Sequence, residues 1–175
     1  AYVGEVKAQC PHAEIVFDLF HVVAKYGREV IDSVRVKEAN RLQNDPKARK
    51  VVKGSKWLLL RNRENVKRPE DQVRLEELLS ANKNLLKVYL MKEDLKSIWD
   101  FRDREKAMAF WGQWFRRAIR SRITPLKAFA KRLSVHINGI LSHCQWPLNS
   151  GMLEGINNKI KVIKRMAYGY RDDEY

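Results

Sequence analysis

The sequence predicts a mainly α-helical chain with one short strand near its N-terminus. Apolar residues recur at spacings of three and four over most of residues 20–167, which is the period of amphipathic helices. The apolar run from Ala13 to Phe17 is short and is followed at once by Asp18, a pattern typical of a buried strand. With 175 residues and 45% hydrophobic content, the chain is long enough for one sizeable core.

The N-terminal elements form half of an α/β unit. Residues 1–10 can form a short helix, which Pro11 and His12 end. The strand is expected at about residues 13–18, and a helix from about Phe20 to Gln43. No second strand is predicted.

The middle of the chain predicts a helical bundle. A short apolar run at 57–60 is expected to pack onto the core as a short helix. Pro69 followed by two acids indicates a helix start, and further helices are expected from about Asn82, from Asp103 to Arg122, and from a Thr124 cap followed by Pro125. Short links between them predict antiparallel packing.

Tryptophan is concentrated in these helices. Trp99, Trp111 and Trp114 lie on the apolar sides of the predicted helices. We interpret them as core anchors rather than as platforms that stack on nucleic-acid bases.

The charge balance favours a polyanionic partner. The formal net charge is +14, and nucleic acid is the usual partner of so basic a domain. Residues 37–68 contain eleven lysines and arginines against three acids, and residues 106–153 contain eight and no acid. Such runs can be solvated surface or can follow phosphates, in which case affinity falls steeply with salt.

Several classes of protein are disfavoured. No apolar run approaches the roughly 18 residues of a membrane span, so no membrane partner is expected. Two cysteines with unrelated flanks give no disulfide framework and favour a cytoplasmic location. Serine and cysteine nucleophile motifs, a P-loop and a dinucleotide-binding glycine motif are absent.

A strongly amphipathic helix is predicted within residues 149–170, N-S-G-M-L-E-G-I-N-N-K-I-K-V-I-K-R-M-A-Y-G-Y. It contains the only carboxylate between Glu105 and Asp172, which is Glu154. The two faces separate at helical spacing. The polar face carries Glu154, Asn157, Asn158, Lys161 and Arg165, and the apolar stripe carries Leu153, Ile156, Ile160, Ile163 and Ala167. A capping-turn glutamate on a solvated helix face would give the same pattern.

Two further groups of residues are candidate sites. Asp18 and His21 place a carboxylate and an imidazole at the end of the predicted strand, where sites assemble in open α/β sheets. A helix-capping aspartate with a hydrogen-bonded histidine is the more common explanation. Two Cys–His pairs lack the usual spacing of zinc ligands, so a zinc site at Cys10, His12, His143 and Cys144 is disfavoured.

The segment A-E-I-V-F-D-L-F-H-V at 13–22, together with S-G-M-L-E-G-I-N-N-K-I-K at 150–161, resembles bacterial insertion-sequence transposases of the DDE class. More narrowly, it resembles the branch with D-x-F-H and S-x-x-x-E-G-x-N-N-x-I-K motifs. These motifs cover the first 25 and last 30 residues or so; the middle resembles the family only in the order and character of its helices.

The resemblance implies a partial ribonuclease-H-like α/β core, with one strand retained, interrupted by a large all-helical insertion. The implied parts are a truncated core at residues 1–43, a basic helical insertion at 44–145 and a core helix within 146–175. Glu154 matches the third catalytic acid, which is a metal ligand. Asp18 and His21 match a family signature that follows the second catalytic aspartate, and Asp18 is not that aspartate itself.

The resemblance also implies chemistry and partners. Mg²⁺ or Mn²⁺ would be the cofactor, and two such ions about 3.5–4 Å apart need several carboxylates. The partners would be the element ends and the target DNA, with a homo-oligomer in the synaptic complex and nucleoid association during activity. We expect Asn157, Asn158, Lys161 and Arg165 to contact DNA. The upstream aspartates are expected to precede Ala1, so the chain would be a C-terminal fragment of the catalytic domain. Such a fragment is expected to be inactive alone, to bind DNA weakly and not to hold the metal stably.

The alternative is a non-enzymatic helical nucleic-acid-binding module in which Glu154 is structural. The two hypotheses differ on catalysis, because only a transposase has strand cleavage to lose when Glu154 is changed. A protein-interaction bundle would predict binding that is insensitive to salt.

Overall fold

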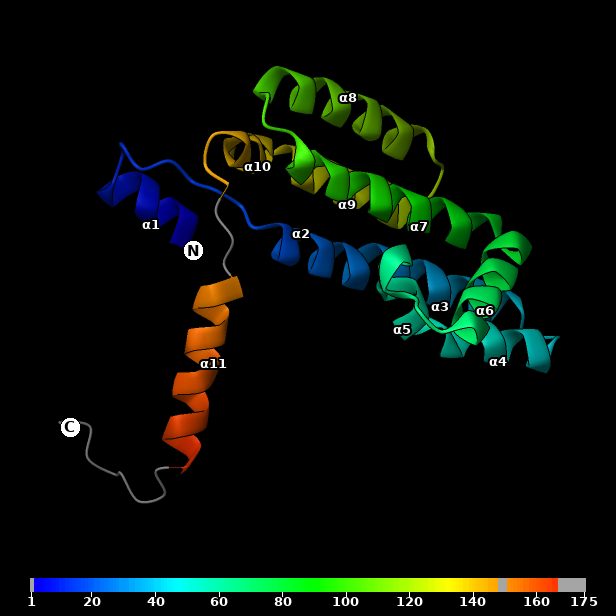
Figure 1. The fold of residues 1–175 in the computed structure, drawn as a ribbon. Helices are drawn as coiled ribbons and strands as arrows, with labels where there is room; N and C mark the ends of the chain where they lie inside the picture. Colours follow the sequence, from blue (N-terminus) through cyan, green and yellow to red (C-terminus); the bar gives the residue numbers. More distant parts are fainter. Residues whose placement is uncertain (1, 148–150, 167–175) are drawn as a thin grey trace.

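The computed structural model describes residues 2–147 and 151–166, and the side chains of residues 3–147 and 155–166. Within these ranges every regular element is a helix or a single helical turn. The predicted mainly α-helical class is therefore confirmed. Figure 1 shows most of the helices packed side by side, with α1 and α11 set apart from them.

The first half of the chain is a long interrupted helix followed by shorter ones. A π-helical turn, η1, joins α2 to α3, and it begins at Gly27, where a Cβ atom would lie 2.6 Å from the Leu60 side chain. A glycine there allows α5 to approach this turn closely. The elements are α1 (Tyr2–Gln9), α2 (Leu19–Tyr26), η1 (Gly27–Ile31), α3 (Asp32–Arg41), α4 (Pro46–Gly54), α5 (Lys56–Leu60) and the 3₁₀ turn η2 (Arg63–Asn65).

The second half contains the long helices. Two of these helices begin directly after a capping side chain. The Asn82 side chain accepts from the Leu85 N–H, and the Asp103 side chain accepts from the Glu105 N–H. The elements are α6 (Pro69–Ala81), α7 (Lys83–Lys96), η3 (Ser97–Asp100), α8 (Arg104–Arg120), α9 (Thr124–Ser134), α10 (Ile137–Leu141), η4 (Ser142–Cys144) and α11 (Gly151–Met166).

The prediction that Thr124 caps α9 is wrong, because the cap position lies one residue earlier. Thr124 is the first residue of α9, and Ile123 occupies the cap position without a side-chain hydrogen bond. Proline in the first turn fixes the start of the helix without a cap, because it has no N–H to satisfy. The preceding turn holds Arg122 at φ 61°, so the link between α8 and α9 closes through a left-handed residue.

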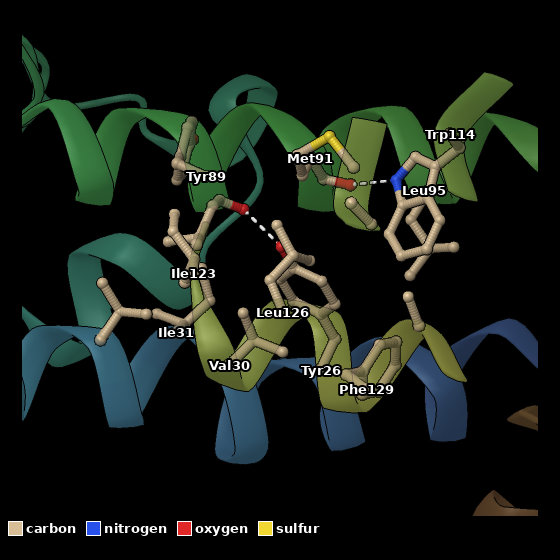
Figure 2. Packing of buried hydrophobic residues seen from close by; sticks show 14 of the residues in the cluster. Tyr26, Val30, Ile31, Tyr89, Met91, Leu95, Trp114, Ile123, Leu126 and Phe129 are labelled. Carbon is tan, nitrogen blue, oxygen red and sulfur yellow. Dashed lines mark hydrogen bonds between the residues drawn. The ribbon is translucent and has the colours of Figure 1, made fainter. Parts of the chain in front are cut away.

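The core is built around α7. This helix contacts α2, α3, α6 and α8, and its side chains at Leu85, Val88 and Leu95 are fully buried. Figure 2 shows Trp114 of α8 pointing onto α7, where its Nε1 donates to the Met91 carbonyl at 2.8 Å. Because α7 has neighbours on most sides, its apolar residues are not confined to one stripe.

The interpretation of three tryptophans as core anchors is confirmed. Trp99, Trp111 and Trp114 are all buried, and the rings of the last two stack at 5.3 Å between centroids. The apolar run at 57–60 behaves differently from expectation. Leu59 is fully buried as predicted, whereas Trp57 is 72% exposed, because the five-residue helix α5 presents only one side to the core.

The strand predicted at about residues 13–18 is not formed within the described residues. The segment carries no strand pairing and lies against α10. Its Phe17 N–H donates to the Gly139 carbonyl at 2.9 Å, and the Trp99 Nε1 donates to the Phe17 carbonyl at 3.3 Å. A strand needs the backbone of a neighbouring strand. Helices and one indole supply the hydrogen bonds here instead, so the segment is held without becoming a strand.

Gly139 allows this close approach. A Cβ atom at that position would lie 2.6 Å from two carbons of the Phe17 ring and 2.9 Å from the Ile15 carbonyl oxygen. Any larger residue would separate the segment from α10. The residue before α2 is therefore positioned by α10, although the two are more than one hundred residues apart in the sequence.

Candidate functional site

Asp18 lies at the N-terminus of α2 and caps it. Its Oδ1 accepts from the Phe20 N–H at 2.6 Å, which satisfies one of the free N–H groups of the first turn. The structure therefore confirms a helix-capping role for Asp18. His21 follows one turn later on the exposed side of α2, with its ring 5.6 Å from that of Phe20.

A pocket of about 430 Å³ opens beside Asp18. Lys96, Asp100 and His143 line it together with the capping aspartate. Burial lowers the pKa of His143 below its ordinary value, and the positive charge of Arg102 lowers that pKa further. The imidazole is therefore held in its neutral form near neutral pH.

Glu14 connects the N-terminal segment to the turn that precedes α11. Its carboxylate accepts from the Ser142 hydroxyl and from the Trp146 Nε1, both at 2.7 Å. These two hydrogen bonds lower the pKa of Glu14 below its ordinary value. The last residues described before α11 and the segment leading into Asp18 are thus held together at one end of the bundle (Figure 1).

The predicted site residues of the C-terminal motif lie on α11. Glu154 belongs to the helix, but its side chain lies outside the described side chains. The four polar residues expected to contact DNA are all exposed: Asn157, Asn158, Lys161 and Arg165. Among the described side chains, no hydrogen bond or ion pair joins one of these four residues to another of the four.

The apolar stripe of α11 is also exposed, which differs from a core-facing helix. Ile156, Ile160 and Ile163 are 49%, 46% and 60% exposed. Leu153 and Ala167, the other two positions of the stripe, lie outside the described side chains. Among the residues whose burial is described, α11 therefore separates its polar and apolar faces by sequence but buries neither.

No metal centre is formed by the described residues alone. No group of three or more His, Cys, Asp or Glu side chains in this part of the chain is placed to hold an ion. The four zinc candidates do not assemble into such a group: Cys10, His12, His143 and Cys144.

The acid-free basic span at residues 106–153 is partly neutralised by acids from other parts of the chain that lie close to it in the structure. Arg117 forms an ion pair with Asp94 at 2.6 Å, and Arg132 pairs with Glu29. Both acids precede the span in sequence and come from other helices. Sequence reasoning missed these pairs because helix packing, not spacing along the chain, brings the partners together.

Sequence reasoning also missed Lys87, which faces the arginines of α8. A groove between α7 and α8 is lined by Lys87 together with Arg116, Arg117 and Arg120. The three arginines belong to the basic span noted in the sequence, but Lys87 lies outside it. Only the packing of the two helices places it there.

A bundle of basic helices, with D-x-F-H at its N-terminal side and a lone glutamate in an amphipathic helix at its C-terminal side, has the sequence pattern of a transposase. A family of transposases, the DDE group named after ISL3, matches the chain over residues 1–175. The chain belongs to this transposase family.

Two curated relatives are also transposases of insertion sequences. The chain is 55% identical over 175 residues to the transposase for insertion sequence element IS1001 of Bordetella parapertussis, covering 100% of this chain and 43% of that protein. It is 28% identical over 193 aligned positions to the transposase for insertion sequence element IS1557 of Mycobacterium tuberculosis, covering 97% of this chain and 42% of that protein. The chain thus spans less than half the length of these relatives. No solved structure matches it.

No described helix is both long enough and apolar enough to cross a membrane.

Proposed function

We propose that the whole protein catalyses Mg²⁺-dependent DNA strand cleavage and strand transfer during transposition of an insertion sequence. One observation carries the proposal: a chain that matches a transposase family over its full length has Glu154 as the lone acid at the head of the polar face of α11. The named relatives are transposases of insertion sequences. The substrates are the element ends and the target DNA, and the active form is a homo-oligomer in the synaptic complex.

In this proposal Glu154 supplies one carboxylate to the metal site, and the other acids come from outside the described residues. A bound Mg²⁺ or Mn²⁺ would lower the pKa of the attacking water or 3′-hydroxyl and stabilise the leaving oxygen. The amides of Asn157 and Asn158 donate to phosphate oxygens. The charges of Lys161 and Arg165, one and two turns further along the same face, neutralise the phosphates of the same strand.

The three parts of the chain then have separate tasks. Residues 1–43 and 146–175 belong to the ribonuclease-H-like core, and residues 44–145 form the helical insertion between its last two acids. The contacts of Glu14 with Ser142 and Trp146 are compatible with this division, because they hold the first part of the chain beside the point where the insertion ends and the last part begins. The 175-residue chain alone would bind DNA weakly, hold the metal poorly and cut nothing.

The test uses the full-length protein and a DNA that carries the element ends. Mg²⁺-dependent nicking is measured for the wild type, for Glu154→Gln, and for Glu70→Gln as a matched control. Glu70 is an exposed acid in the first turn of α6, so its change removes the same charge from an equivalent helix position. We expect wild type and Glu70→Gln to cut, and Glu154→Gln to bind the DNA without cutting it.

Two results would contradict the proposal. If Glu154→Gln cuts as fast as the wild type, the glutamate is a helix-start carboxylate and not a metal ligand. If none of the three proteins cuts although all bind DNA in a salt-dependent manner, the chain belongs to a binding module without catalysis.

A further inference from the structure

The groove between α7 and α8 has an unusual concentration of positive charge. It measures about 530 Å³ and is lined by seven residues, of which four are cationic and none is acidic. One wall comes from α7 through Lys87 and Met91, and the other from α8. All four cationic side chains are exposed: Lys87, Arg116, Arg117 and Arg120.

Most of this charge has no acidic partner. Only Arg117 forms an ion pair, with Asp94 at 2.6 Å. Lys87, Arg116 and Arg120 have no carboxylate within 4.0 Å among the described residues. Their charges therefore remain available to an external anion.

The positions of the arginines on α8 are not explained by helix stability alone. Arg117 and Arg120 lie in the last turn, where cations interact favourably with the helix dipole. Arg116 and Arg120 are four residues apart on one face, and like charges at this spacing destabilise a helix. A bound anion would remove that repulsion.

The groove has a fixed floor. Met91 is 2% exposed, and Ser121 is 8% exposed. The Ser121 hydroxyl donates to the Ala118 carbonyl at 2.7 Å and accepts from the Ile123 N–H at 3.1 Å. The cationic side chains therefore stand at the edges of a shape that the core determines, rather than on a mobile loop.

We propose that the α7–α8 groove binds the phosphate backbone of duplex DNA. Arg116 and Arg120 are separated by about 6 Å along the helix axis, which suits neighbouring phosphates of a strand better than the oxygens of a single phosphate. Lys87 approaches the same strand from the facing helix. The contact is independent of base sequence, because hydrogen bonds and ion pairs to phosphates carry no sequence information. This inference rests on the proposed function, which supplies DNA as the partner.

The binding test uses the full-length protein and a 30-base-pair duplex without the element ends, with the dissociation constant measured over a series of salt concentrations. Arg116→Ala/Arg120→Ala removes two of the groove's cations. Each phosphate contact contributes about −0.9 to the slope of log K against log salt. We expect the slope to become less negative by about 1.8 for this pair, with at least a tenfold loss of affinity at low salt.

Two further variants make the result specific. Arg49→Ala/Lys53→Ala removes the same charge at the same spacing from α4, and both residues are exposed. We expect it to change the slope by less than half as much. Arg116→Lys/Arg120→Lys keeps the charge and should keep most of the slope. Circular dichroism checks that each variant is folded.

The proposal is overturned if the α4 pair weakens binding as much as the groove pair, because net charge would then explain both. It is also overturned if the groove pair leaves the slope unchanged. Cleavage of element-end DNA by the groove variant, measured at low salt, separates this inference from the proposed function. If the groove variant cuts this DNA and its salt slope is unchanged, the groove proposal is rejected and the transposase proposal stands. Loss of slope in a protein that cuts nothing rejects the transposase activity alone.

Discussion

Lys92 is a buried cation whose removal should be costly. Its side chain is 1% exposed, and its Nζ donates to the carbonyls of Leu59 at 3.0 Å and Arg61 at 2.7 Å. These carbonyls lie at the C-terminal end of α5, where helix carbonyls have no intrahelical partner. Glu93 lies 3.1 Å from the same Nζ, and the Tyr89 ring lies 4.4 Å away. A single ammonium group therefore caps α5 and fixes it to α7.

The substitution Lys92→Met keeps the apolar stem and removes the donor. Three hydrogen bonds from a charged group are lost, of which the one to the Leu60 carbonyl is long at 3.4 Å. The two shorter ones are worth about 1.5–3 kcal/mol each. Part of this loss is offset, because burial lowers the pKa of Lys92, which shows that the charged form is costly to hold there. The Glu93 side chain is 26% exposed as a whole, but its Oε1, the oxygen that faces the Nζ, is buried and has no other hydrogen-bond partner among the described residues. Loss of the ammonium group therefore adds to the cost. We expect a net destabilisation of about 3 kcal/mol.

Urea unfolding of the 175-residue chain, followed by circular dichroism and tryptophan fluorescence, measures this difference. About 3 kcal/mol corresponds to a fall in Tm of about 6–12 °C for a chain of this size. Lys83→Met is the control, because Lys83 is exposed at the first position of the same helix. If the two variants differ by less than about 0.5 kcal/mol, a range typical of surface substitutions, the carbonyls of α5 do not depend on Lys92 and the reasoning is refuted.

Three further predictions concern the segments around the bundle. Gly139→Ala should destabilise the chain by about 2 kcal/mol, because its Cβ would lie 2.6 Å from the Phe17 ring; urea unfolding measures this. Arg122→Gly should stabilise by about 0.5–1 kcal/mol, since Arg122 has φ 61°, with a raised Tm as the readout. Glu14→Gln should increase hydrogen exchange at residues 142–146, and the difference from wild type should be present above the ordinary pKa of Glu14 and disappear as the pH falls through its lowered pKa.

Each of these predictions has a matched control. Gly54→Ala places a Cβ in open space and should be neutral or slightly stabilising; an equal loss in both glycine variants would contradict the argument from close approach. Arg122→Ala keeps the left-handed penalty and should show no gain. Glu5→Gln, in exposed α1, should leave exchange at 142–146 unchanged at every pH.

Helix starts were the most predictable part of the fold, because local chemistry determines them. Asn82 and Asp103 cap α7 and α8 as their sequence context indicates. Pro69 and its two following acids mark the start of α6. A cap acts within three residues, so no knowledge of tertiary packing is needed to recognise it.

The strand could not be predicted correctly from local pattern. The apolar run at 13–17 satisfies the composition of a buried strand, but strand formation depends on a partner that is remote in sequence. In the described residues Gly139 and Trp99 supply that partner's hydrogen bonds. Trp57 shows that local pattern is also a poor guide to the burial of single side chains. A four-residue apolar run predicts burial of all its members, while a helix of one and a half turns can bury only one side.

The basic span illustrates why a charge count along the sequence does not locate a binding surface. Three of its eight cations have an acid within 4.0 Å: Lys106, Arg117 and Arg132. The acids that pair with the two arginines, Asp94 and Glu29, come from other helices. The remaining five are free of described carboxylates, and two of them, Arg116 and Arg120, line the groove with Lys87. Packing thus neutralises part of a long basic run and concentrates another part on one concave surface. The salt dependence of DNA binding should therefore follow the charges of that groove rather than the formal charge of the span.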